Sequence, residues 1–190
     1  MTPFAIATRQ RYDGDAAHAL YELTQEMTEQ AGLPAYEISN HARPGAECRH
    51  NLAYWRYQDY LGIGPGAHGR VTLGNQKIAT RQRRAPEAWL AAVEENGDAF
   101  DELSPIARDE AVEEMVMMGL RLVEGLSRRR LEELADRAVE RLFGAALPRL
   151  VDGGFLSLDG DRLAATAAGR QRLNAVLGVL FASRSAESDQ

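Results

Sequence analysis

The spacing of the apolar residues changes near residue 85, and this change limits the chain to a mixed α+β fold. Before residue 85, short β-prone segments bounded by Asn, Pro and Gly predict strands at 35–38 and 60–63. A hairpin is predicted around Gly74-Asn75, because both residues tolerate positive φ and β-prone residues flank them. After residue 85, apolar residues recur every three or four positions, which is typical of amphipathic helices. The first segment therefore contributes strands and the second mainly helices.

Helix start and stop signals divide the chain further. An amphipathic helix over residues 13–31 is predicted to precede the strands, because its apolar residues follow helical spacing up to Gly32. Pro86 begins a helix that reaches about residue 95, and Ser104-Pro105 is expected to cap a longer helix. The middle of the chain is therefore expected to be helical from residue 86 onwards.

The C-terminal part predicts helices followed by a hairpin, which is the order of a winged-helix module. Helices are expected from Ser127 to residue 151. Segment 155–164 then surrounds Asp159-Gly160, a type I′ turn signal, and Thr166 is expected to cap a final helix. We therefore expect a mainly helical C-terminal domain with a winged-helix-like end.

The composition excludes several classes of function. The chain has one cysteine, Cys48, so it cannot by itself supply the roughly four ligands of a Cys-rich zinc or iron–sulfur site. The formal net charge of -6 argues against nucleic-acid binding, which depends on Lys and Arg contacts to phosphates. No apolar run reaches the roughly 20 residues of a membrane span, and the sequence lacks a secretory signal pattern. The expected compartment is the cytoplasm.

Residues 36–69 concentrate the side chains that can carry chemistry. This stretch contains three of the four histidines, the cysteine and several aromatic residues. Within it, His50 and Asn51 lie next to Tyr54 and Trp55 in a segment expected to be a loop. An imidazole can ligate iron, and aromatic rings can lie against a flat macrocycle. In the alternative interpretation, the aromatic residues anchor the loop on the core and His50 only hydrogen-bonds to backbone.

Three other patterns give weaker signals. His41, Cys48 and His50 could ligate a metal, but they lack a fourth ligand at suitable spacing. Residues 64–69 match the G-x-G-x-x-G pattern, but strand-like residues follow where a dinucleotide-binding fold has a helix. This segment is better interpreted as a glycine-rich strand end that a ligand can approach closely. Arg128–Arg130 could contact phosphate, but the neighbouring glutamates favour a solvated helix face.

The long motif in residues 36–69 resembles one known family. YEISN-x-ARPG-x-x-CRHNL-x-YW, followed by YLGIG-x-GAHG, closely resembles the oxygen-independent coproporphyrinogen III oxidase family, in its HemW-type haem-chaperone branch. The resemblance continues more loosely around Trp89, residues 118–122 and residues 153–173, and so covers nearly the whole chain.

The resemblance implies a fold with two parts. Residues 1–84 are expected to supply the closing strands of a radical-SAM barrel with the haem-motif loop, and residues 85–183 the helical, winged-helix-like domain. Residues 184–190 are expected to form a disordered tail. The family's N-terminal half carries the Cys-x3-Cys-x2-Cys loop that holds a [4Fe-4S] cluster and binds S-adenosylmethionine, and this sequence does not contain that loop. Because Thr2-Pro3-Phe4 resembles a segment from the middle of the family, Met1 is expected to be an internal start.

The resemblance also implies the binding residues. In the family's HN-x-x-YW signature, His50 would attach haem or ligate its iron, in a site lined by Asn51, Tyr54 and Trp55. By position, Gly66, Ala67 and His68 would approach S-adenosylmethionine. Haem is therefore the cofactor expected in this chain, and S-adenosylmethionine and [4Fe-4S] are expected only in a full-length protein.

Three functions follow as expectations. The first is haem binding and delivery to an acceptor protein, by a fragment that cannot cleave S-adenosylmethionine alone. The second is the oxidase reaction, which converts coproporphyrinogen III to protoporphyrinogen IX. The third is a winged-helix interaction module. Because barrel strands without their partners leave an open sheet edge, homo-oligomers through that edge are also expected.

Overall fold

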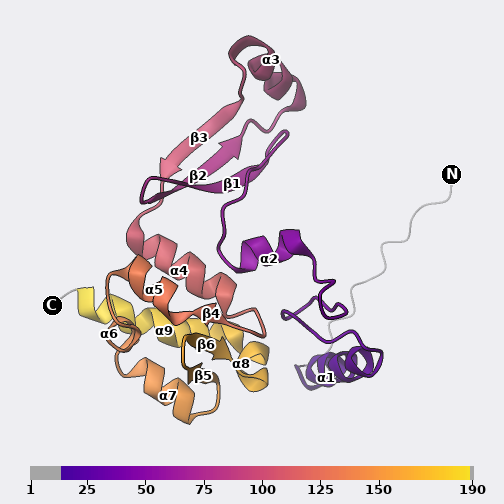
Figure 1. Ribbon diagram of the computed structural model, residues 1–190, viewed down its shortest axis with the longest axis vertical. Helices are drawn as coiled ribbons and strands as arrows, with labels where there is room; N and C mark the ends of the chain where they lie inside the picture. The colour runs from indigo at the N-terminus through magenta and orange to yellow at the C-terminus, as the bar shows by residue number, and fades with distance from the viewer. Residues whose placement is uncertain (1–13, 189–190) are drawn as a thin grey trace.

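The computed structural model describes the backbone of residues 14–188 and the side chains of residues 16–184. It has a mixed α+β architecture with two small antiparallel sheets. Figure 1 shows one sheet with helix α3 at one end of the molecule, helices α4 to α9 at the other, and helix α2 between them. In the described part of the chain, no helix is both long enough and apolar enough to span a membrane.

The first helix, α1 (Gly14–Gln30), confirms the predicted amphipathic segment, although Asp13 lies outside the described residues. Its apolar face is largely uncovered, because the side chains of Leu20, Leu23 and Met27 are 45%, 49% and 61% exposed. An apolar helix face usually packs against a core. Among the described residues, none covers most of this apolar face.

The strands expected at 35–38 and 60–63 do not form as regular elements. Only single bridges occur there, joining Ala35 to His41, Glu37 to Leu122 and Tyr60 to Arg70. In the first segment the chain turns at once, since the amides of Tyr36 and Glu37 both donate to the Asn40 carbonyl. Hydrogen bonds within this turn therefore take the place of the strand-to-strand hydrogen bonds that the β-prone residues predict.

The larger sheet has the order β1-β2-β3 and consists of β1 (His68–Leu73), β2 (Gln76–Gln82) and β3 (Phe100–Pro105). The predicted hairpin is confirmed: Leu73 pairs with Gln76, and Gly74 takes a φ of 61°. Helix α3 (Pro86–Asn96) begins at the proline as predicted and ends at Gly97, which adopts the left-handed conformation.

Strand β3 corrects one prediction. Ser104-Pro105 ends this strand instead of capping a helix, and helix α4 (Arg108–Gly119) begins three residues later. Ser104 pairs with Ala79 of β2, so the antiparallel ladder prevails over the local capping signal. The sheet therefore takes strands from both sides of the boundary predicted at residue 85.

The second sheet and its helices form the C-terminal part. Strand β4 (Leu126–Ser127) pairs with β6 (Arg162–Ala165), which also pairs with β5 (Leu156–Asp159). The helices between β4 and β5 are α5 (Arg128–Ala135), α6 (Val139–Phe143) and α7 (Ala146–Asp152). Ser127 caps α5 as predicted, because its side chain accepts a hydrogen bond from the Arg130 amide.

The hairpin turn lies one residue further along than predicted. Asp159 pairs with Arg162, so the central residues are Gly160-Asp161 rather than Asp159-Gly160. Gly160 takes a φ of 54° at the first central position, where type II′ turns place glycine. Thr166 then caps α8 (Ala167–Gln171), and a separate helix α9 (Leu173–Ser188) follows. Residues 184–188 are therefore helical instead of a disordered tail, and 189–190 lie outside the described residues.

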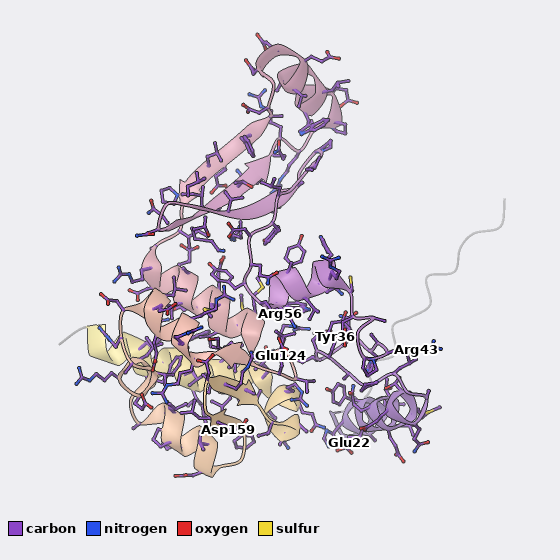
Figure 2. All side chains as sticks on the ribbon, viewed as in Figure 1. Glu22, Tyr36, Arg43, Arg56, Glu124 and Asp159 are labelled. Carbon is purple, nitrogen blue, oxygen red and sulfur yellow. The ribbon has the colours of Figure 1, made fainter. Side chains whose placement is uncertain are left out.

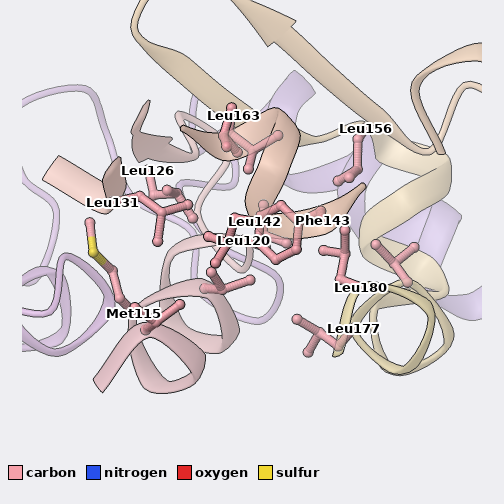
Figure 3. Close-up of a cluster of buried hydrophobic side chains, with 14 of the residues drawn as sticks. Met115, Leu120, Leu126, Leu131, Leu142, Phe143, Leu156, Leu163, Leu177 and Leu180 are labelled. Carbon is pink, nitrogen blue, oxygen red and sulfur yellow. The ribbon is translucent and has the colours of Figure 1, made fainter. Parts of the chain in front are cut away.

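The main hydrophobic core lies within this C-terminal part. Helix α4 buries Ala111, Val112, Met115 and Val116 on one face, at the spacing that helical periodicity requires. Figure 3 shows side chains from α4, α5, α6, α9 and the small sheet meeting in one cluster. Its most deeply buried members include Phe143, Leu131 and Leu163, all with 0% exposure. This core fixes α4 as the platform on which α2 rests.

Candidate haem-binding site

Helix α2 (Arg49–Trp55) carries the residues of the histidine and aromatic motif, in the segment expected to be a loop. Its first backbone bond runs from the Leu52 amide to the Cys48 carbonyl. The helix ends because Tyr57 adopts a left-handed φ of 53°, which reverses the chain. The motif is thus presented by a helical turn of fixed geometry, which determines the direction of each side chain.

One face of α2 presents His50 and Tyr54, which are four residues apart. Their ring centroids lie 4.6 Å apart at an interplanar angle of 72°, an edge-to-face contact. The Tyr54 ring also contacts the Tyr60 ring, with 4.2 Å between centroids. His50 is exposed, whereas the two tyrosines are half-buried. Within the described residues, no side chain or backbone group hydrogen-bonds to either imidazole nitrogen of His50. This face therefore offers an accessible imidazole beside two aromatic rings.

The adjacent face of α2 presents Asn51 and Trp55, again four residues apart. The Asn51 side-chain amide donates a hydrogen bond to the Tyr36 hydroxyl over 3.3 Å. The Trp55 ring lies under the Arg121 guanidinium, 4.4 Å from its carbon to the ring centroid. The Trp55 Nε1 donor is buried and has no hydrogen-bond partner. The structure therefore brings all four predicted residues onto one helix, but on two faces with different surroundings.

A buried carboxylate supports the second face. The Glu37 side chain is 0% exposed and forms an ion pair with Arg121 over 3.1 Å. Glu37 also accepts hydrogen bonds from the Ser39 amide, at 2.7 Å, and from the Asn40 side chain. A buried charge is tolerated only when it is paired and hydrogen-bonded in this way. Glu37 therefore fixes Arg121, and Arg121 fixes Trp55.

A second polar cluster holds the C-terminal end of α2 against α4 and β1. The Tyr57 hydroxyl donates to Glu114 over 2.8 Å, and Arg70 binds the same carboxylate through two nitrogens at 2.7 and 3.1 Å. Burial acts to raise the pKa of Glu114, but the hydrogen bonds from Arg70 and Tyr57 outweigh it and lower that pKa. Burial and the bond to Glu114 raise the pKa of Tyr57. Tyr57 therefore stays neutral and Glu114 ionised at neutral pH.

The α2 helix also contacts the C-terminal part through Arg56. Its guanidinium binds both carboxylate oxygens of Glu124, at 2.8 and 3.3 Å. Figure 2 shows these two side chains between α2 and the helices below it. Both partners are about two-fifths exposed, so this pair orients α2 more than it stabilises the fold.

Gly66, Ala67 and His68 lie at a different place, on the approach to β1 at the end of the sheet next to α3. The Gly66 amide donates to the Arg83 carbonyl, and the Ala67 carbonyl accepts from the Gln82 amide, both over 2.8 Å. His68 is exposed at the start of β1. Their backbone bonds join them to β2 and the residue after it rather than to α2, and proximity to S-adenosylmethionine stays a prediction.

The described part of the chain does not gather side chains that could ligate a metal ion by themselves. No group of three or more His, Cys, Asp or Glu side chains there is arranged to hold a metal ion. His41, Cys48 and His50 therefore do not gather into one site. Cys48 is exposed, immediately before α2.

Three supporting residues were not among the predicted site residues: Tyr60 contacts Tyr54, Arg121 contacts Trp55, and Glu37 binds Arg121. Tyr60 and Glu37 were assigned to strands, and Arg121 lies 84 residues from Glu37 in sequence. The sequence offers one sign of the buried carboxylate, which is a glutamate within the β-prone segment 35–38. Such glutamates are too common to predict a buried ion pair. Long-range pairs of this kind become visible only in the folded chain.

Several known proteins are similar to this chain over most of its length. Residues 106–172 match the family described as HemN C-terminal domain. The chain is 34% identical over 176 residues to radical S-adenosyl methionine domain-containing protein 1, mitochondrial, from Danio rerio, and this match covers 88% of the chain and 40% of that protein. It is 31% identical over 162 residues to heme chaperone HemW of Bacillus subtilis, covering 85% of the chain and 42% of the relative.

A second heme chaperone HemW, from Mycobacterium tuberculosis, is 36% identical over 169 residues, covering 89% of the chain and 40% of the relative. Among solved structures, that of coproporphyrinogen III oxidase (HemN) from Escherichia coli superimposes with a TM-score of 0.62 at 18% identity. The superposition covers 89% of this chain and 42% of that one, and it shows a shared fold. The chain therefore spans less than half the length of these relatives.

Proposed function

We propose that the chain is the C-terminal part of a HemW-type haem-binding protein, because residues 106–172 match the HemN C-terminal domain family and most of the chain is similar to heme chaperones named HemW. His50 is the residue proposed to ligate the haem iron. The accessible imidazole beside Tyr54 and Tyr60 carries this proposal, because a neutral imidazole is a common haem ligand and aromatic rings suit a flat macrocycle.

The two faces of α2 suggest a division of labour. On the first face, His50 would bind the iron, while Tyr54 and Tyr60 would contact the macrocycle. On the second face, Asn51 and Trp55 would hold the helix through Tyr36 and Arg121. Haem, when bound, would supply the iron, and the chain's own contribution would be to orient the His50 imidazole that holds it. An exposed ligand of this kind favours reversible binding and delivery to an acceptor protein, as in the relatives named heme chaperones.

The exposed apolar side chains support the proposal that a larger partner segment is required. Leu61 and Ile63 are 69% and 85% exposed, in addition to the uncovered face of α1. In the proposed full-length protein, this surface would contact a radical-SAM half that holds [4Fe-4S] and S-adenosylmethionine. Segment 60–63 would then continue its barrel, and the remaining helices would form the winged-helix-like end. The proposed compartment is the cytoplasm, although one relative's name places it in mitochondria.

The direct test is titration of the chain with haem, followed by the Soret absorption band. The wild type is expected to shift the band saturably, and His50→Ala to weaken binding by at least about tenfold, which corresponds to about 1.4 kcal/mol. His18→Ala is a matched control, because it removes an exposed histidine on α1 that pairs only with Glu22. A wild-type protein that leaves the Soret band unchanged would refute the proposal.

The oxidase reaction is a second candidate, favoured by the HemN C-terminal domain match. Because the described residues hold no cluster ligands, the reaction would need the radical-SAM half. The test is anaerobic conversion of coproporphyrinogen III by a full-length protein with reconstituted cluster. Product formation would support the oxidase, and haem binding without product would support the chaperone.

The third candidate, a winged-helix interaction module, draws on the order of α4, β4, α5 to α7 and the β5–β6 hairpin. Arg128 contributes little to nucleic-acid binding, because it pairs with Glu132 at 2.9 Å and Glu140 at 2.8 Å. A salt-dependent gel shift would favour this module, and its absence at moderate protein concentration would exclude nucleic acid as the partner.

A further inference from the structure

A cavity of about 310 Å³ lies between the C-terminal end of α2, the N-terminal end of α5 and the β5–β6 turn. Its apolar lining comes from Trp55, Met115 and Leu126, of which the last two belong to the buried core. Its charged lining includes four arginines, Arg56, Arg129, Arg130 and Arg162. We call this cavity the arginine pocket.

The two carboxylates of the arginine pocket are already engaged. Glu124 binds Arg56 through both oxygens. Asp161 accepts hydrogen bonds from the Arg129 backbone amide and the Ser127 hydroxyl, each over 2.8 Å, and these bonds lower its pKa. Asp161 therefore acts as a cap for α5 and remains ionised. The negative charge of Asp161 therefore compensates the partial positive charge at the N-terminal end of α5 more than it compensates the arginine side chains.

The remaining arginine side chains are weakly held. Arg130 reaches the Arg56 carbonyl through one nitrogen at 3.4 Å, and Arg129 lies 3.9 Å from Glu133 with both side chains mostly exposed. The pocket lining thus carries four arginines against two carboxylates, although the whole chain has a formal net charge of -6. A local positive excess in an acidic chain favours an anionic ligand at this place.

We propose that the arginine pocket binds the oxyanion group of a small molecule with a planar apolar body. The guanidinium groups match carboxylate or phosphate oxygens through paired N–H donors. Trp55 is the least buried of the apolar lining residues and provides the apolar surface for the planar part. A porphyrin propionate and a nucleotide phosphate share this chemistry. His50 lies on the other face of α2 and does not line the pocket.

Tryptophan emission gives a local readout of binding. The chain has two tryptophans, so Trp89→Phe leaves Trp55 as the only tryptophan, in the pocket lining. Metal-free protoporphyrin IX, adenosine 5′-monophosphate and inorganic phosphate are titrated separately, with calorimetry as a second measurement. At least one planar probe is expected to bind more tightly than inorganic phosphate. Porphyrin binding that the pocket arginine variants weaken would assign a carboxylate ligand, and nucleotide binding that they weaken would assign a phosphate ligand.

Variants test the role of the arginines. Arg129→Gln with Arg130→Gln is expected to weaken the binding of that probe by about tenfold or more, as for the loss of charge-assisted hydrogen bonds. Arg83→Gln with Arg84→Gln removes the same charge outside the pocket and is expected to leave binding within about twofold. Arg162→Gln supplies an independent variant on the β5–β6 turn, in case the double variant fails to fold.

Three results would overturn the inference. The first is that neither planar probe binds, and the second is that inorganic phosphate binds as tightly as both. The third is that the pocket variants retain wild-type affinity. His50→Ala is expected to keep the binding of metal-free protoporphyrin or nucleotide, because neither probe offers iron to an imidazole. The Soret titration therefore tests haem ligation by His50, and the probe titrations test binding in the arginine pocket. Either proposal can fail without the other.

Discussion

The Arg121 guanidinium lies over the Trp55 ring, 4.4 Å from its centroid, while its Nη2 nitrogen binds the buried carboxylate of Glu37. This chain of contacts joins the segment before α2, the helix itself and the turn that follows α4. Because Glu37 has no exposed surface, its charge depends on Arg121 for compensation. The orientation of Trp55 is therefore coupled to a buried ion pair.

Removing that compensation should destabilise the fold. Arg121→Gln leaves the Glu37 carboxylate buried without a cation, and we expect a loss of about 3 kcal/mol in the free energy of unfolding. Urea denaturation measures the loss, and Trp55 emission should shift because the ring loses its cation. Arg108→Gln is the matched control: it breaks an exposed ion pair with Asp136 and should cost at most about 0.5 kcal/mol. Equal costs for the two variants would contradict this account.

The stability should depend on pH through Glu114. Its pKa is lowered in the folded chain, so its contribution is complete above the ordinary value of 4.5 and is lost as the pH falls below it. Glu114→Gln should cost about 2 kcal/mol at pH 7 and should make the loss of stability below pH 4.5 shallower. Glu110→Gln, an exposed change on the same helix, should leave the slope unaltered. Denaturant titrations at several pH values measure the dependence of the free energy of unfolding on pH. If the wild type and Glu114→Gln showed the same dependence, Glu114 would not be responsible for it.

Two glycines should respond in opposite directions to the same substitution. A Cβ at Gly169 would overlap the Phe155 carbonyl oxygen, so Gly169→Ala should destabilise by about 3 kcal/mol. A Cβ at Gly178 would meet nothing within 4 Å, and this residue lies in the interior of α9. Gly178→Ala should stabilise by about 0.5–1 kcal/mol through helix propensity. Thermal unfolding of both variants checks the pair, and a stabilising Gly169→Ala would disprove the packing shown around α8.

The isolated chain should self-associate through segment 61–63. Ile63 is 85% exposed next to the bridge between Tyr60 and Arg70, so apolar surface adjoins an unpaired edge. Ile63→Asp should shift sedimentation profiles towards the monomer. Leu73→Asp changes a comparably exposed leucine, at the β1–β2 turn, and should leave the profile unchanged. A wild-type chain that is monomeric at all concentrations would show that this edge is not adhesive.

Local signals in the sequence predicted the elements that depend on local chemistry. Gly74, Ser127 and Thr166 fix a turn and two helix starts through their own backbone or side chains, and each lies where it was expected. Ser104-Pro105 misled because its capping signal competes with a ladder to β2, a partner some 25 residues away. The Gly160-Asp161 turn differs by one residue, since cross-strand pairing decides the register.

The sequence predicted which residues make up the candidate site, but it did not predict how their side chains are arranged. His50, Asn51, Tyr54 and Trp55 lie together on α2, and this follows from their closeness in sequence. Their separation into two faces required the knowledge that this segment is helical, which a seven-residue helix without a side-chain cap does not reveal. The partners Tyr60, Glu37 and Arg121 come from distant segments, and no periodic pattern predicts such contacts.

The left-handed residue Tyr57 sets the rotational phase of α2. Consecutive helical residues are about 100° apart around the axis, so a single residue inserted between Trp55 and Tyr57 would turn both faces by that angle. The imidazole would then leave its place beside the tyrosines, and the indole would leave its place under Arg121. A chain with such an insertion could keep every motif residue and the C-terminal core, yet present them in the wrong direction.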